Sequence, residues 1–254
     1  MTKPGERNPL TDRPAITIAS DLHNNVLALG ILERAANGGP VLFAGDLTDR
    51  GSPLESRLTR PVAELGHPLV FVSGNHDSDT LQRDLAQRGA VVLTQGKVAT
   101  VAGLKIAGYS GPYERRSAED FKDRYDNQPT PEMKEDFTSW VMPLVNHTDV
   151  VMVHEPALIE PALAILEDRA PARPLVFVVG HTHTAAVEHQ PGVTVVNGGS
   201  VGAGGTGNLA DEPTDIGIAR LIYTTKPAFQ PLATDLVSID PGTGSATARR
   251  ERLD

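Results

Sequence analysis

Residues 40–51 read PVLFAGDLTDRG. A short apolar run, residues 40–44, is followed by a glycine and then by two aspartates, Asp46 and Asp49. The run is continuously apolar rather than alternating, which is typical of a strand buried on both faces of its sheet. Similar runs occupy residues 15–20 (AITIAS) and 68–73 (PLVFVS), and amphipathic stretches separate them. The alternation of strand and helix patterns predicts an α/β fold with crossover helices.

Further elements follow from the same patterns. Residues 90–108 are rich in β-formers and carry turn signals at Gln95-Gly96 and Ala102-Gly103, which predicts hairpins. Helical spacing of apolar residues predicts helices at 26–36, 54–65 and 80–87. Additional strands are predicted at 149–153, 174–179, 193–197 and 216–223.

The length of 254 residues is compatible with one large domain, which we expect over residues 14–240. Residues 1–13 are polar and are predicted to be a disordered leader, and residues 241–254 are predicted to be a polar tail. Residues 109–147 are polar with interspersed aromatic side chains. We expect this segment to leave the core as an excursion near the active site.

Composition narrows the class of protein. The chain has 23 Lys+Arg against 32 Asp+Glu, a net charge of −9, so nucleic acid is not an expected partner. The absence of cysteine excludes disulfides, thiolate metal sites and a catalytic thiol. No run approaches the ~18 apolar residues of a membrane span, and no signal peptide is recognisable. We therefore expect a cytoplasmic protein; an anchor outside this chain is the alternative.

Five of the apolar runs end in side chains that can bind metal. The carboxyl ends of strands form the ligand crevice of open α/β sheets, so we expect these side chains to meet at one edge of the fold. Carboxylates, imidazoles and an amide oxygen, without sulfur, suit manganese, iron or zinc. Four histidines and two aspartates are more than one ion normally uses, which predicts two ions sharing a carboxylate. The groups are Asp21-Leu22-His23, Gly45-Asp46-Leu47-Thr48-Asp49-Arg50-Gly51, Gly74-Asn75-His76-Asp77, His154 and Gly180-His181-Thr182-His183.

Taken in order, these motifs resemble those of the calcineurin-like metallophosphoesterases. The matching patterns are D-x-H, G-D-x-x-D-R-G, G-N-H-D, a strand-end His and G-H-x-H, over roughly residues 16–200. The resemblance implies a four-layer α/β/β/α sandwich of two mixed β-sheets, with the metal site at the strand carboxyl ends. It also implies two divalent ions, with manganese favoured over iron and zinc.

The resemblance further implies a role for each residue. The ligands of the first metal would be Asp21, His23 and His183, with Asp46 as the bridge. The ligands that complete the second metal would be Asn75, His154 and His181. His76 would protonate the leaving group, and Asp49 would orient His76 through a hydrogen bond. Asp49 also stands where a helix N-cap could be, and both roles are compatible.

Substrate contacts are less narrowly defined. Asn75 would stabilise the phosphoryl oxygens, and Arg50 resembles the phosphate-contacting arginine of superfamily protein phosphatases; a surface ion pair is the alternative for Arg50. Within the excursion, we favour solvated charges for Arg115 and Arg116. We favour packing roles over base stacking for Tyr113, Tyr125 and Trp140.

We therefore expect hydrolysis of a small phosphorylated substrate by attack of a metal-bridging hydroxide, with His76 as general acid. The G-N-H-D and G-H-x-H forms resemble those of small phosphodiesterases and favour a diester. Arg50 favours the alternative, a phosphomonoesterase or a protein-phosphatase-like enzyme. A non-catalytic metal-binding scaffold and a membrane-linked regulatory domain are further alternatives. The sequence does not indicate an oligomeric state.

Overall fold

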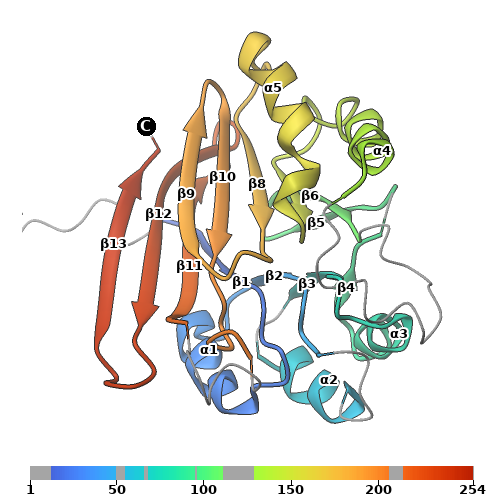
Figure 1. The fold of residues 1–254 in the computed structure, drawn as a ribbon. Coiled ribbons are helices and arrows are strands. Elements are labelled where there is room, and N and C mark those ends of the chain that lie inside the picture. The colour runs from blue at the N-terminus through green and yellow to red at the C-terminus, as the bar shows by residue number, and fades with distance from the viewer. Residues whose placement is uncertain are drawn as a thin grey trace, which may run out of the picture.

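The computed structural model describes residues 13–49, 55–65, 68–94, 96–110, 129–205 and 214–253. Within these ranges, two mixed β-sheets pack face to face and helices cover both outer sides (Figure 1). This is the four-layer α/β/β/α arrangement that the resemblance to the calcineurin-like metallophosphoesterases implies. Most of the predicted leader, Arg50 and residues 111–128 of the predicted excursion lie outside the described residues.

The first sheet has seven strands in the order β13-β12-β11-β1-β2-β3-β4. Four of them, β1 to β4, run parallel to one another, and the other three add antiparallel strands on the β1 side. The strands are β1 (Ala15–Ala19), β2 (Val41–Ala44), β3 (Leu69–Val72), β4 (Val91–Val92), β11 (Ile216–Thr224), β12 (Gln230–Ile239) and β13 (Ala246–Arg252).

The second sheet has six strands in the order β5-β6-β7-β8-β10-β9. Its four central strands are parallel, and an antiparallel strand closes each edge. The strands are β5 (Val98–Val101), β6 (Leu104–Tyr109), β7 (Val150–Val153), β8 (Leu175–Val179), β9 (Ala185–Gln190) and β10 (Val193–Gly198).

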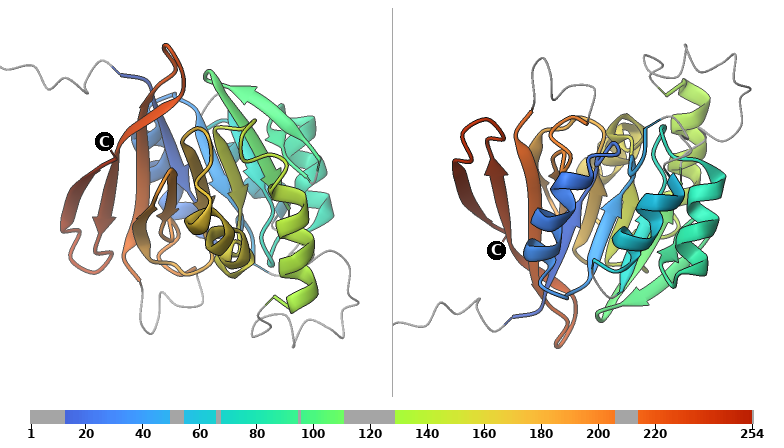
Figure 2. Two further views of the ribbon diagram at one scale, coloured as in Figure 1. Left: turned by 90° about the horizontal axis from the view of Figure 1, so that it is seen from above. Right: turned by 90° about the horizontal axis from the view of Figure 1, so that it is seen from below.

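Helices form the two outer layers, seen from above and below in Figure 2. The first sheet is covered by η1 (Val26–Ala28), α1 (Leu29–Ala36), α2 (Glu55–Ala63) and α3 (Asp79–Gln87). The second sheet is covered by α4 (Pro131–Val141), η3 (Pro156–Leu158) and α5 (Glu160–Asp168). None of the helices in the described ranges is long and apolar enough to cross a membrane.

Three apolar layers explain why the central strands are continuously apolar. Between the sheets, Ile18, Val70 and Val178 share one buried cluster. Neighbouring residues on the same strands face outward instead: Phe71 packs beneath the helices of the first sheet, and Phe177 beneath those of the second. Central strands of this kind contribute to two cores, and β2, β3, β7 and β8 are accordingly apolar at every position.

The carboxyl-terminal segment differs from the prediction of a polar tail. Residues 246–252 form β13, which pairs antiparallel with β12 from Ala246 opposite Ile239 to Arg252 opposite Ala233. Nearly all of β13 is exposed, so polar side chains stand on both of its faces and the alternation that marks a half-buried strand is missing. Charged side chains also suit a sheet edge, because they oppose pairing with another chain.

Two other segments differ in detail. Residues 90–108 contain one hairpin, β5–β6, which turns at Ala102-Gly103, whereas β4 joins the first sheet parallel to β3. The chain therefore passes from one sheet to the other between β4 and β5. In the predicted excursion, α4 is part of the outer helical layer: Phe137 is fully buried, and the Trp140 ring lies 5.1 Å from that of Tyr109 between centroids.

The close approach of the two sheets is testable at Gly108 on β6. A Cβ atom there would lie 2.8 Å from Val72 Cγ1 and would also overlap Leu93. We expect Gly108→Ala to lower the free energy of unfolding by about 1–3 kcal/mol, because the core cannot accept the added methyl group.

Gly30 in α1 is the matched control, since nothing lies within 4 Å of a Cβ atom at that position. We expect Gly30→Ala to raise the free energy of unfolding by roughly 0.5–1 kcal/mol. Urea unfolding midpoints measure both effects. A neutral Gly108→Ala would mean that the sheets are not this closely packed.

Candidate metal centre

The seven predicted ligand residues converge at the carboxyl ends of β1, β2, β3, β7 and β8. Three of these strands belong to the first sheet and two to the second, so the site lies where the ends of both sheets meet. Five of the seven side chains are buried, and the last two are half-buried. The seven are Asp21, His23, Asp46, Asn75, His154, His181 and His183.

Their donor atoms fall into overlapping groups, within each of which all atoms lie within 4.8 Å of one another. One group is Asp21, His23 and His183, and another is Asp46, His154 and His181. Asp46 Oδ2 joins the two, because it lies 3.7 Å from His23 Nε2 and 3.1 Å from His154 Nε2. This is the position that a carboxylate shared by two ions would occupy.

The polypeptide reaches these positions through an unusual backbone. Asp21, His23, Asp46, His181 and His183 all have φ between 45° and 70°, in the left-handed region that non-glycine residues seldom adopt. Strain of this kind is typical of functional sites held by the surrounding structure. The left-handed turns direct consecutive strand-end side chains inward toward one point.

Glycines allow the loops to approach one another. A Cβ atom on Gly74 would lie 2.7 Å from the backbone nitrogen of Asp46 and would overlap its carboxylate. A Cβ atom on Gly180 would lie 2.8 Å from the carbonyl oxygen of Ala44 and 3.0 Å from Asp21 Oδ2. These two glycines therefore provide space for ligand carboxylates.

A half-buried carboxylate outside the predicted ligand set holds the loops together. Asp77, the last residue of Gly74-Asn75-His76-Asp77, accepts hydrogen bonds from the backbone N–H groups of Asp46 at 2.8 Å, Gly74 at 2.9 Å and Thr48 at 3.0 Å. Burial, together with the nearby charge of Asp46, raises the pKa of Asp77 to about 6. Asp77 lies within the motif, but no side-chain pattern in the sequence reveals these three backbone partners.

The Asp46 carboxylate is fixed through its second oxygen. Oδ1 accepts a hydrogen bond from the His76 backbone N–H at 2.9 Å, which leaves Oδ2 facing His23 and His154. The two strand-end loops that carry Asp46 and His76 are thus joined directly at the site.

His76 and Asp49 lie together beside the ligands. His76 Nδ1 is 3.0 Å from Asp49 Oδ1, and His76 Nε2 is 3.9 Å from Asp46 Oδ2. Residues 50–54, between Asp49 and the first described residue of α2, lie outside the described residues, so the N-cap role of Asp49 stays a prediction. Arg50 lies outside the described residues, and its contact with phosphate stays a prediction.

The buried carboxylates and imidazoles of the site shift one another's pKa values when no metal is bound. Burial alone would raise the pKa values of Asp21 and Asp46, but neighbouring imidazoles lower both, that of Asp46 to about 2. Burial alone would lower the pKa of His154, but the charges of Asp46 and Asp21 raise it to about 10. Without metal, protons on imidazoles therefore balance the buried carboxylates.

The residues present fit divalent ions. Among the described residues, Asn75 Oδ1 and His154 Nε2 are buried and have no hydrogen-bond partner, although His154 Nε2 lies near Asp46. His23 Nε2 and His183 Nε2 face each other at 3.1 Å. Buried oxygen and nitrogen donors of these types are what a metal site of this composition requires once protons have left the imidazoles. The clustered groups are consistent with two metals.

Residues 15–210 match the family described as Calcineurin-like phosphoesterase superfamily domain. The chain belongs to this family. A sequence comparison with curated proteins finds no match.

The chain is also similar to several solved structures at low sequence identity. A Vps29 single mutant from Entamoeba histolytica is 14% identical with a TM-score of 0.50, covering 95% of this chain and 100% of the other. Vacuolar Protein Sorting 29 from Cryptosporidium parvum is 15% identical with a TM-score of 0.50, covering 95% and 98%. Yfce, a phosphoesterase from E. coli, is 16% identical with a TM-score of 0.48, covering 95% and 100%. At these identities the likeness concerns the fold alone.

The His154 proton makes metal binding to this calcineurin-like domain depend on pH. With a pKa of about 10, His154 is protonated at neutral pH in the metal-free protein, and a bound ion must displace that proton. Affinity therefore rises with pH, by up to about tenfold per unit from this group between about pH 7 and about pH 9.

Manganese titration calorimetry at several pH values, in buffers with different heats of ionisation, measures both the slope and the protons released. His189→Gln is the control, because His189 is exposed on the edge strand β9, and it should keep the wild-type slope. Affinity independent of pH would contradict the protonated state of His154.

Proposed function

We propose that this domain is a dinuclear metal-dependent phosphodiesterase. The observation that supports it most is the position of Asp46 Oδ2 between His23 Nε2 and His154 Nε2, at 3.7 and 3.1 Å. One shared carboxylate between two sets of ligands suits two adjacent ions. The His76–Asp49 pair beside it supplies a candidate proton donor.

Each ion would have its own ligands. Asp21, His23 and His183 would hold the first, and Asn75, His154 and His181 the second, with Asp46 shared between them. When bound, such ions polarise phosphoryl oxygens and lower the pKa of water. We propose manganese, although iron and zinc accept the same ligands.

His76 would act as general acid. Asp49 accepts a hydrogen bond from the Nδ1–H group at 3.0 Å, which orients the ring and leaves Nε2 facing the ligands. The nucleophile would be a hydroxide ion, which bound ions favour by lowering the pKa of water. As the hydroxide oxygen forms its bond to phosphorus, the bond from phosphorus to the leaving oxygen would break. The proton on His76 Nε2 would pass to that oxygen, so that the leaving group departs as a neutral alcohol.

The substrate would be a small phosphate diester. The net charge of −9 opposes a broad surface for nucleic acid, whereas a local centre of cations can still bind one phosphate group. The forms of the Gly74-Asn75-His76-Asp77 and Gly180-His181-Thr182-His183 motifs favour a diester. Arg50 is the feature that favours a monoester.

Hydrolysis of bis-p-nitrophenyl phosphate and of p-nitrophenyl phosphate by the manganese-loaded protein tests this proposal. We expect higher kcat/KM for the diester. A preference for the monoester would favour the phosphomonoesterase alternative. If protein with two bound manganese ions hydrolyses neither ester, the domain is a non-catalytic metal-binding scaffold.

Replacing His76 separates proton donation from metal binding. We expect His76→Ala to lower kcat by ~10²–10⁴-fold, the usual contribution of general acid catalysis, with both metals retained. Elemental analysis of the purified variant measures the metal content. His76 also lies within reach of His23 and Asp46 as a possible ligand, so loss of a metal in His76→Ala would show that it binds metal instead.

A further inference from the structure

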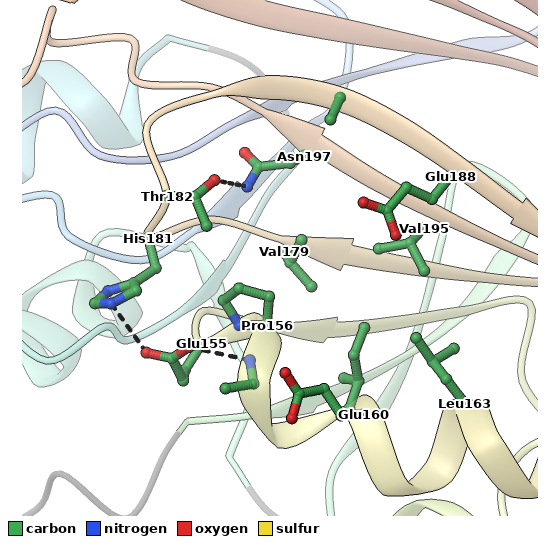
Figure 3. Close-up of a pocket in the computed structure, with 13 residues that line it drawn as sticks. Glu155, Pro156, Glu160, Leu163, Val179, His181, Thr182, Glu188, Val195 and Asn197 are labelled. Atoms are coloured by element: carbon green, nitrogen blue, oxygen red, sulfur yellow. Dashed lines mark hydrogen bonds and ion pairs between the residues drawn. The ribbon is translucent and has the colours of Figure 1, made fainter. Parts of the chain in front are cut away.

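One candidate ligand has a buried carboxylate behind it. Glu155 Oε2 lies 3.0 Å from His181 Nε2, as Figure 3 shows. Glu155 directly follows His154 at the end of β7, and His181 follows β8, so neighbouring strands bring the two side chains together. Glu155 belongs to none of the motifs in the sequence.

The Glu155 carboxylate has a fixed orientation. Its other oxygen, Oε1, accepts a hydrogen bond from the Ala157 backbone N–H at 3.0 Å and caps η3. The residue is only 3% exposed. The carboxylate cannot turn away from His181 without losing this hydrogen bond. Oε1 therefore stays on the Ala157 N–H group, and Oε2 stays on the His181 imidazole.

The contact decides which nitrogen of His181 can bind metal. A neutral imidazole has one N–H donor and one nitrogen with a lone pair, and an ionised carboxylate can only accept a hydrogen bond. The partner of Glu155 Oε2 is therefore the Nε2–H group, and the lone pair is on Nδ1. A ligand histidine commonly donates its second N–H to a carboxylate in this way.

The surroundings explain why a charged acceptor is useful here. His181 and Glu155 line a cavity of about 390 Å³ together with Glu188, Leu163 and Val179. The His181 side chain is 30% exposed, so water could compete for its N–H group. A carboxylate forms a stronger hydrogen bond than a neutral acceptor does and keeps the ring in one orientation.

We propose that Glu155 is a positioning residue that holds His181 in the Nε2–H form, so that Nδ1 faces the second metal position. The inference rests on the proposed function, in which His181 is a ligand of that metal. It adds a residue whose effect on the ion passes entirely through His181.

The decisive variant is Glu155→Gln. Its amide has one oxygen, which the Ala157 N–H requires, so the NH₂ group would face His181. That group donates a hydrogen bond to Nε2 and favours a proton on Nδ1, where it blocks the metal. The substitution keeps the size of the side chain and the cap of η3, so the fold should be retained. Glu188→Gln is the matched control, because Glu188 lines the same cavity but is exposed on β9.

Two measurements on the full chain test the proposal. Zinc titration calorimetry should give two ions for the wild type and for Glu188→Gln, with the second bound ~10–100-fold more weakly in Glu155→Gln. Nitrogen-15 NMR of the zinc-loaded wild type should show His181 coordinated through Nδ1 with a proton on Nε2. The His181 signals are assigned by their loss in His181→Gln.

The outcomes separate this inference from the proposed function. Coordination through Nε2, or wild-type zinc affinity in Glu155→Gln, would overturn the positioning role and leave the proposed hydrolysis standing. A wild type that binds two zinc ions through the expected nitrogen, but whose manganese form hydrolyses no ester, would overturn the proposed function alone. Fewer than two ions in the wild type would overturn both.

Discussion

Two buried carboxylates, Asp21 and Asp46, impose the main constraint on this structure, because their charge lies where the ends of both sheets meet. An isolated charge in such a place costs far more than the fold could offset, so cations or protonated imidazoles must surround it. His23, His154 and His183 lie within 4 Å of one or both carboxylates. The strand-end loops are arranged around this requirement, and the backbone strain at the site is one of its costs.

Much of the fold could be predicted because buried parallel strands have a simple signature. Strands such as β2 and β8 contact apolar layers on both faces, and their sequences show it. The strands β9 and β13 are exposed or half-buried edge strands without that signature, so the sequence does not predict them. The long strand β12 lies between two antiparallel neighbours, and Pro231 and Asp235 interrupt its apolar pattern.

The candidate ligands could be predicted from the sequence, whereas the residues that support them could not. The ligands lie at the ends of strands that meet at one edge of the fold. Each ligand motif therefore directly follows an apolar run in the sequence and has a recognisable spacing of residues. Asp77 accepts hydrogen bonds from three backbone N–H groups, and Glu155 contacts a side chain from the next strand. Such partners depend on how loops lie in space, and neither residue type nor spacing along the chain encodes them.

The pairing of β1 with β11 has a consequence for how the protein is made. β1 is the first strand in the described chain, yet one of its two neighbours in the sheet comes from residues 216–224. During synthesis, Ala15–Ala19 must therefore leave the ribosome long before its antiparallel neighbour exists. Contacts this remote in sequence slow folding. Until β11 arrives, the exposed edge of β1 is a place where a nascent chain could pair wrongly or recruit a chaperone.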